Sequence, residues 1–464
     1  MKKRDIRLPA KAGVWYVCAS AAIKLGGMAA TPIFTGAMSK EEYGKYALYM
    51  SWIAILSVVS TLGLSGGVIY RGMQKFKDRQ DELVSSALGL ALLSLTVFAI
   101  ISIIWRERIS AITGLEDGLI SLLFLQMTLD AAVALYTARC RYLYGYRGVI
   151  AINVASALLS LGASILLVLL FRPTADVRVL ALFFSTLVFA LPLLIIVIFK
   201  GRKLYSREIW GFLLKFNLPL LPYCASSAIL ANVDKVMISG IAGGASLAKY
   251  AVAHSLGVGM TFVTGGLGSA LQPWIMRKVE AGRERRVADV SLKVTLIVAI
   301  GALAILTLAP EVFSFLAPDS YSDAIVSVYP ITLSAIISFI SSVASAGILH
   351  AERTGLLSLS ALVGAAVNIA ANLILLPHSY NGAAFSLLLA SAVSTAVAVF
   401  ASMRIMRAPI VRLLPSVGIF AVSALIAAML YALRENMLPR IAILLALSAI
   451  GLVALIKIKR DVTE

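Results

Sequence analysis

Fourteen apolar runs fill most of this 464-residue chain, each near the roughly 20 residues that a helix needs to cross a bilayer. A backbone inside the hydrocarbon core must satisfy its own hydrogen bonds, and in runs of this length a helix does so. The residues are 60% hydrophobic with a mean hydropathy of +0.94, well above the composition of soluble proteins. The sequence therefore predicts an all-α polytopic membrane protein with about 14 transmembrane helices. They are expected near residues 12–37, 43–70, 83–104, 117–138, 148–171, 176–199, 213–239, 246–270, 289–316, 322–349, 355–377, 381–403, 411–433 and 441–457.

The first half of the chain recurs in the second half at a nearly constant offset. Cys18–Ala22 recurs as Cys224–Ala228, at an offset of 206 residues. Three further pairs keep the same order and nearly the same spacing: Lys45–Ala47 with Lys249–Ala251, Arg71 with Arg277, and Gly148 with Gly355. Such repeats are typical of transporters, whose two halves move about a shared central site.

Each copy of the repeat holds an even number of expected spans, so both copies enter the membrane from the same side. We therefore expect two pseudo-symmetric six-helix lobes related by a parallel repeat. The N-terminal lobe is expected in residues 1–205 and the C-terminal lobe in 206–408. Residues 409–464 are expected to add two transmembrane helices and a cytoplasmic tail.

The basic residues lie mostly on one side of the expected helices. With the N-terminus in the cytoplasm, the inner segments hold 28 of the 41 lysines and arginines, and the outer loops hold 7. Positive residues mark the cytoplasmic side, so both termini are expected on the inner face of the cell membrane. The net charge of +18 is explained by these basic loops, which set the topology and attract anionic lipid headgroups. Because the charge is explained in this way, we expect no nucleic-acid partner.

Several motifs of enzymes and metal sites are missing from the sequence. It contains no GxxxxGK[ST] phosphate loop, no HExxH and no CxxC. We therefore expect no cofactor, no metal site and no enzymatic activity. Uphill transport must then draw on an ion gradient, the membrane potential or consumption of the product. The three cysteines, Cys18, Cys140 and Cys224, lie in or beside spans and predict no disulfide framework.

Lys24 lies deep in the first expected span, roughly 18 Å from its start at 1.5 Å per residue. Its own stem cannot reach the interface from there. A lysine at this depth costs about 3 kcal/mol to insert, so it should face a bundle interior or a wet cavity. One side of this helix is polar: Tyr16, Ser20, Lys24, Gly27, Thr31 and Thr35. We expect this stripe to line a substrate cavity; the alternative is a lysine neutralised by a structural carboxylate.

Asp130 lies in the fourth expected span, about 12 Å from its cytoplasmic end at 1.5 Å per residue. Three interpretations stay open: it lines an inner vestibule, it pairs with Lys24, or it pairs with Arg141. Arg139 and Arg141 follow the same span on its cytoplasmic side and are expected to attract an anionic substrate.

Two polar positions in the second half complete the candidate binding residues. His254 lies well inside the eighth expected span, where an imidazole can exchange protons near neutral pH. Its neighbours on that face are mostly small residues, which usually permit close helix packing. Asn372 follows Asn368 by one turn in the eleventh span, and the pair either bonds between helices or meets substrate.

Four short stretches, in this order along the spans, resemble a known family: Pro32–Gly44, Gly63–Gly67, Asp234–Gly240 and Asn372–Ala384. With them the sequence resembles the oligosaccharide flippase branch of the multidrug/oligosaccharidyl-lipid/polysaccharide exporter superfamily. The resemblance implies alternating access and translocation of a polyprenyl-diphosphate-linked oligosaccharide for surface polysaccharide biosynthesis. The implied partners are this lipid-linked substrate and the membrane lipids. The polysaccharide polymerase machinery is a further candidate partner.

The residues fit an anionic substrate, since a diphosphate would be drawn to Lys24 and to cytoplasmic arginines. The last two spans are expected to guide its lipid tail. Three alternatives remain open. An ion-coupled multidrug or metabolite exporter of the same fold should present acidic groups at mid-depth of the membrane. A membrane-embedded polysaccharide polymerase or ligase should have a substantial outer loop. A catalytically silent scaffold should keep its function after mutation of any cavity residue.

Overall fold

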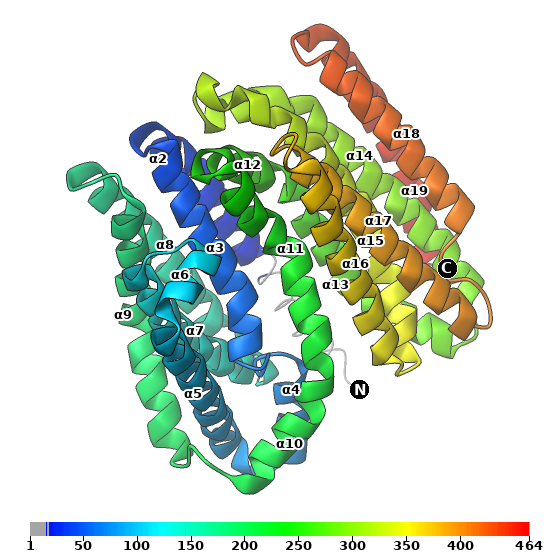
Figure 1. Ribbon diagram of the computed structural model, residues 1–464. Coiled ribbons are helices and arrows are strands. Elements are labelled where there is room, and N and C mark those ends of the chain that lie inside the picture. Colours follow the sequence, from blue (N-terminus) through cyan, green and yellow to red (C-terminus); the bar gives the residue numbers. More distant parts are fainter. Residues whose placement is uncertain (1–14, 16–17, 144, 464) are drawn as a thin grey trace. The chain divides into compact units, whose positions relative to one another are not determined.

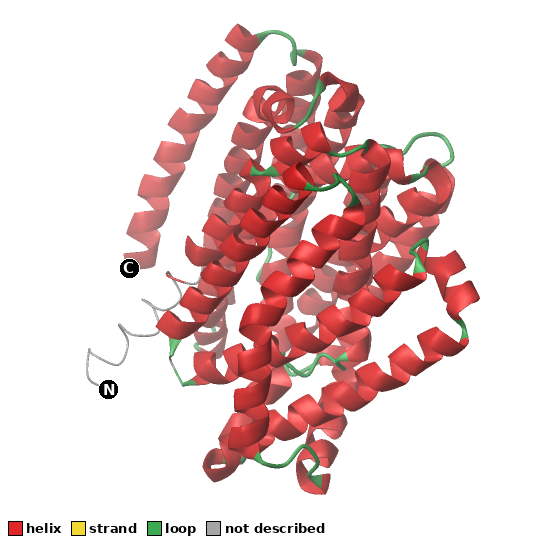
Figure 2. Ribbon diagram, turned by 90° about the vertical axis from the view of Figure 1, so that its left-hand side faces the viewer, coloured by secondary structure: helices red, strands yellow, loops and turns green. Residues whose placement is uncertain are grey.

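A computed structural model describes residues 15, 18–143 and 145–463, without side-chain detail at 67, 146, 270, 450 and 452–463. Within this described part the regular elements are helices joined by short turns (Figure 2). The predicted all-α class is therefore confirmed. The chain divides into two compact units, Met1–Ala228 and Ile229–Glu464. The lobe limits expected at residues 205 and 408 stay predictions.

Unit 1 begins with a helical segment over residues 18–29. It continues with α2 (Thr31–Ala37), α3 (Lys40–Ser60), α4 (Gly67–Lys75), η1 (Lys77–Arg79), α5 (Gln80–Ile104), α6 (Arg106–Thr113), α7 (Asp117–Tyr142), α8 (Tyr146–Leu170), α9 (Ala175–Gly201), α10 (Arg207–Asn217) and η2 (Leu218–Leu220). The boundary between the units falls inside the next helix, α11 (Leu221–Ala242).

Unit 2 contains the remaining helices of the chain. They are α12 (Gly244–Gly257), α13 (Gly259–Glu280), α14 (Glu284–Leu316), η3 (Asp319–Ala324), α15 (Ile325–His350), α16 (Thr354–Leu375), α17 (Gly382–Ile405), α18 (Leu413–Ala432) and α19 (Met437–Thr463). Helices α18 and α19 pack against α14, within this unit (Figure 1).

Ten helices in the described residues are long and apolar enough to cross a membrane, and they match ten of the fourteen expected spans. The described residues of the other four expected spans, the first, second, eighth and last, are also mostly helical. The chain is thus a multi-pass membrane protein.

Three of these expected spans are interrupted, and the first of them divides at Ala30, between the helical segment 18–29 and α2. The run 43–70 divides into α3 and α4 because Leu62 and Gly63 take left-handed backbone angles, with φ of 55° and 61°. Such residues end the i to i−4 hydrogen-bond ladder. The run 246–270 divides at Val258 into α12 and α13. Apolar composition alone predicted all three runs as continuous.

The turn between α3 and α4 has the spacing Gly63-Leu64-Ser65-Gly66-Gly67, which matches the GxSxG pattern of a nucleophile elbow. In hydrolases this pattern joins a strand to a helix. Here both flanking elements are helices, so Ser65 lies outside the setting that makes it a nucleophile.

The two units repeat the same internal packing. In unit 1, α7 packs against α5 and α9, and α8 packs against α9 (Figure 1). In unit 2, α15 packs in the same way against α14 and α17, and α16 packs against α17. An ion pair repeats as well: Lys45 Nζ lies 2.7 Å from Glu116 Oε1, and Lys249 Nζ lies 2.9 Å from Asp323 Oδ2. The internal repeat predicted from the sequence is therefore present in the fold.

The start of α5 lies against the segment that follows α9. The hydroxyls of Ser85 and Ser86 donate to the Lys203 carbonyl over 2.8 and 3.1 Å, and the indole of Trp210 donates to the Ser86 carbonyl over 2.9 Å. A Cβ placed on Gly89 would overlap the backbone of Leu204. A residue without a side chain is therefore needed at position 89.

We predict that Gly89→Ala destabilises unit 1 by about 1–3 kcal/mol, because the added methyl group meets backbone that cannot move aside. The thermal midpoint of the detergent-solubilised protein, followed by tryptophan fluorescence, should fall. Gly118→Ala is the matched control, since a Cβ on Gly118 meets no atom within 4 Å. Equal midpoints for the Gly89 variant and the wild type would contradict the close approach.

Candidate functional site

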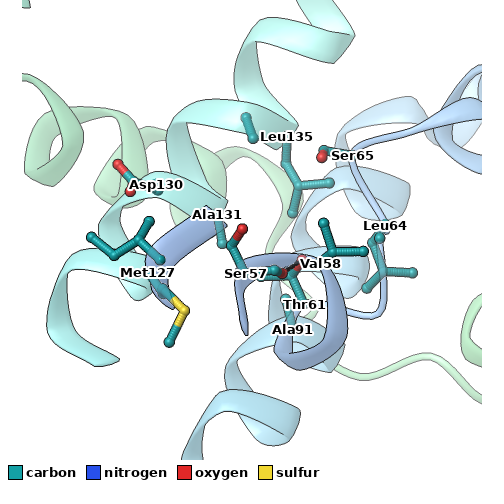
Figure 3. Close-up of a pocket in the computed structure, with 13 residues that line it drawn as sticks. Ser57, Val58, Thr61, Leu64, Ser65, Ala91, Met127, Asp130, Ala131 and Leu135 are labelled. Carbon is teal, nitrogen blue, oxygen red and sulfur yellow. Dashed lines mark hydrogen bonds between the residues drawn. The ribbon is translucent and has the colours of Figure 1, made fainter. Parts of the chain in front are cut away.

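Unit 1 contains a small cavity of about 210 Å³ beside the turn that ends α3. Ser57, Thr61 and Ser65 lie on one side of it, and Asp130 and Ala131 of α7 lie on the other (Figure 3). Leu135, Met127 and Ala91 complete an otherwise apolar wall. One acidic residue and three residues with hydroxyls thus line a partly open space among apolar helices.

A second, large cavity of about 540 Å³ lies among the first helical segment, α2, α3, α7, α8 and α9 of the same unit. Four polar residues of α8 line it at helical spacing, so one face of α8 is polar: Asn153, Ser156, Ser160 and Ser164. Arg178, Asp130 and Thr186 add further polar groups, while Phe34, Tyr46 and Phe189 supply aromatic walls. The volume falls in the range of about 300–1,000 Å³ that is typical of small-ligand sites.

Asp130 lines both cavities. Its carboxylate accepts a hydrogen bond of 3.0 Å from Gln126 Nε2, one turn earlier on α7. The same Gln126 nitrogen lies 3.1 Å from the Thr186 hydroxyl on α9. Of the three interpretations left open by the sequence, the contacts favour cavity lining over an ion pair with Arg141. Contact between Asp130 and substrate stays a prediction.

Arg178 projects from the first turn of α9 into an aromatic cluster. Its guanidinium carbon lies 3.7 Å from the ring centroids of both Phe34 and Tyr46, and 5.3 Å from that of Tyr43. These distances are well inside the roughly 6 Å range of cation–π contacts. The guanidinium is therefore held by three rings at the edge of the large cavity.

The polar stripe predicted on the first helix divides in the structure. Gly27 lines the large cavity, while Thr31 and Thr35 are buried with hydroxyls that donate to Gly27 O (3.3 Å) and Thr31 O (3.1 Å). Ser20 and Lys24 are exposed, and the described lining of the large cavity does not include them. Tyr16 lies outside the described residues. The substrate role of Ser20, Lys24 and Thr31 stays a prediction.

The two arginines at the end of α7 differ in their surroundings. Arg139 Nη2 lies 2.6 Å from Asp81 Oδ1 on α5, in a half-buried ion pair. Arg141 is exposed. Arg139 therefore joins two helices of unit 1, and attraction of substrate by either residue stays a prediction.

Unit 2 has a buried polar contact between α11 and α12. The Tyr250 hydroxyl donates to the carboxylate of Asp234, and both residues are fully buried. The ring of His254 lies 5.8 Å from that of Tyr250, one turn further along α12. The structure thus places His254 beside a carboxylate–phenol pair, which the sequence did not indicate.

Asn368 and Asn372 are both fully buried in α16. Asn368 Nδ2 donates to the Leu230 carbonyl of α11 over 3.1 Å, and Asn372 Nδ2 donates to Asn368 Oδ1 over 3.1 Å. Asn368 therefore bonds between helices, one of the two roles predicted for the pair. The oxygen Oδ1 of Asn372 is buried without a hydrogen-bond partner among the described residues.

Sequence reasoning missed Arg178 and Asp234 as candidate site residues. Arg178 is one of the seven basic residues assigned to the outer loops, although it lies within the expected span 176–199. Its position inside that span, together with the aromatic residues of α2 and α3, was the signal. Asp234 lies near one end of the expected span 213–239, and its hydrogen bond with Tyr250 is a contact that no local pattern reveals.

A family model described as "Polysaccharide biosynthesis protein" matches residues 10–279, more than half of the chain. No curated protein is significantly similar to the chain. Among solved structures, the "Lipid II flippase MurJ, inward closed conformation" superposes with a TM-score of 0.72 at 15% identity, covering 97% of this chain and 100% of that one.

Multidrug transporters of the MATE family are also similar in fold. An inward-facing member of the MOP superfamily has a TM-score of 0.63 at 16% identity, covering 82% of this chain and 94% of that one. An outward-facing conformation has a TM-score of 0.60 at 14% identity, covering 86% and 95%. Together with the family match, this fold places the chain in the polysaccharide biosynthesis protein family of the multidrug/oligosaccharidyl-lipid/polysaccharide exporter superfamily.

Proposed function

We propose that this protein is a flippase that moves a polyprenyl-diphosphate-linked oligosaccharide across the cell membrane for surface polysaccharide biosynthesis. The observation that supports it most is the polysaccharide biosynthesis family match on a chain whose fold follows the lipid II flippase over its whole length. The polar cavities of unit 1 add support, because hydroxyl, amide and charged groups inside an apolar bundle suit a glycan headgroup.

In this proposal the protein is a transporter, not an enzyme, and works by alternating access with both termini in the cytoplasm. The glycan crosses through a polar interior while the lipid tail stays in the bilayer. Membrane lipids and the lipid-linked oligosaccharide are its partners, and the polymerase that consumes flipped units is a candidate further partner.

An ion-coupled multidrug exporter is the second candidate, favoured by the similarity to MATE transporters. It would carry a substrate without a lipid anchor. Efflux of a cationic dye from vesicles, driven by a sodium or proton gradient, would support this candidate.

Depletion of the protein in its host tests the main proposal. A flippase defect should leave a complete lipid-linked repeat unit facing the cytoplasm, because assembly precedes translocation. Analysis of extracted lipid-linked intermediates, with their accessibility to an external glycosidase, measures this. Accumulation of single units on the outer face would instead indicate a polymerase.

Lys24→Glu is expected to lower surface polysaccharide at least about ten-fold, since the change places a negative charge where a diphosphate should pass. Surface polysaccharide is measured at matched protein levels. Lys40→Glu, a lysine at the start of α3, serves as the control and should leave the polysaccharide unchanged. A wild-type amount of surface polysaccharide in the Lys24→Glu variant would show that Lys24 does not lie on the substrate path.

A further inference from the structure

Arg178 is a charged residue whose surroundings supply aromatic rings but no counter-charge. Among the described residues, no carboxylate lies within ion-pair distance of its guanidinium, whereas both neighbouring acids have other partners. Asp176 lies 3.4 Å from Lys45 Nζ, and the Glu42 carboxylate accepts from the backbone of Ala175. The Nη1 atom of Arg178 is buried without a hydrogen-bond partner in the described part of the chain.

Stability of α9 does not explain an arginine at this position. The residue lies in the first turn of α9, where the helix dipole disfavours a positive charge. Stacking on Phe34 and Tyr46 compensates in part. A buried donor left unpaired still costs about 1–3 kcal/mol, and a charged side chain inside a membrane segment commonly marks a functional site.

The large cavity supplies the rest of a binding site. Arg178 lines it together with Asn153, Ser156 and Ser160, whose amide and hydroxyls both donate and accept. The ionised carboxylate of Asp130, on another helix of the lining, only accepts hydrogen bonds, and sugar hydroxyls can donate them. This set of groups suits a sugar that bears one negatively charged group.

We propose that Arg178 binds an oxyanion on the substrate's headgroup, with the sugar hydroxyls held by Asn153, the α8 serines and Asp130. The planar guanidinium can engage a carboxylate or a phosphate through two parallel hydrogen bonds while its faces stay stacked. The oxyanion is a sugar carboxylate or the diphosphate of the lipid carrier, and both share this chemistry. The inference rests on the proposed function, because it specifies the substrate class.

The binding of small anionic and neutral probes to the purified, detergent-solubilised protein tests the proposed role of Arg178. The probes are a glucuronic-acid-containing disaccharide, its neutral glucose counterpart and farnesyl diphosphate. We expect the wild type to bind at least one anionic probe ten-fold or more tightly than the neutral disaccharide. Arg178→Gln should abolish this preference, and Arg172→Gln, a matched exposed arginine in the turn before α9, should keep it. The anionic probe that loses affinity identifies the source of the oxyanion.

Arg178→Lys is a second variant that distinguishes loss of anion binding from misfolding, because it keeps the positive charge and loses the planar guanidinium group. It should show an intermediate preference. Equal binding of anionic and neutral probes by the wild type, or a preference that survives in Arg178→Gln, would overturn the inference.

Translocation of lipid-linked substrate is measured separately on the same preparations. A wild type that flips its substrate but binds all probes equally overturns the inference alone. A wild type that binds the anionic probe through Arg178 but flips nothing contradicts the flippase proposal alone.

Discussion

Asp130→Asn is expected to lower translocation at least about ten-fold while the protein stays folded. The asparagine keeps the size of the side chain and an oxygen that accepts from Gln126 Nε2, so the contact to α7 and α9 survives. It removes the negative charge of a residue that lines both cavities of unit 1. A hydrogen bond from substrate to a charged acceptor contributes about 1.5–3 kcal/mol, which corresponds to a ten-fold loss or more.

The measurement is the initial rate of substrate translocation, with protein amount and thermal midpoint matched to the wild type. Asp117→Asn is the control, because Asp117 is an exposed carboxylate at the start of the same helix. Equal rates for the wild type and the Asp130 variant would mean that neither cavity contributes its carboxylate to transport.

Glu311→Ala is expected to destabilise unit 2 by about 3 kcal/mol, the cost of leaving a buried charge without its partner. Arg440 of α19 is 3% exposed, and its guanidinium contacts the Glu311 carboxylate through both Nη atoms. Nη1 also donates to the Thr307 carbonyl over 2.6 Å. These bonds join α19 to α14, so their loss should loosen the last helix.

Thermal unfolding in detergent measures this effect. Asp319→Ala, an exposed acid shortly after α14, should change stability by less than about 0.5 kcal/mol. The double variant Glu311→Ala with Arg440→Met should recover part of the loss, because it removes the unpaired charge. A Glu311 variant as stable as the wild type would show that the pair does not hold α19 in place.

Long apolar runs made most of the fold predictable. A run such as 355–377 has one stable arrangement in a bilayer, and α16 follows it within two residues at each end. The break at Leu62 and Gly63 was not predictable, because it depends on backbone angles that composition does not encode.

The candidate site was less predictable than the fold. Asp130 was recognised because an acid in the middle of an apolar run is rare. Arg178 was missed because its position depends on three rings from α2 and α3, which are far from it in sequence. Asp234 was missed for the same reason, since its burial depends on the Tyr250 hydroxyl.

Translocation in reconstituted vesicles tests the flippase proposal most directly. Vesicles that contain the purified protein and a polyprenyl-diphosphate-linked oligosaccharide are sampled with an external glycosidase, which reads the fraction of substrate in the outer leaflet. The proposal predicts protein-dependent exposure of substrate that was initially inside, slowed by Asp130→Asn and unaffected by Asp117→Asn. Substrate that stays inside in the presence of folded protein, together with gradient-driven efflux of a cationic dye, would contradict the proposal and favour the multidrug exporter.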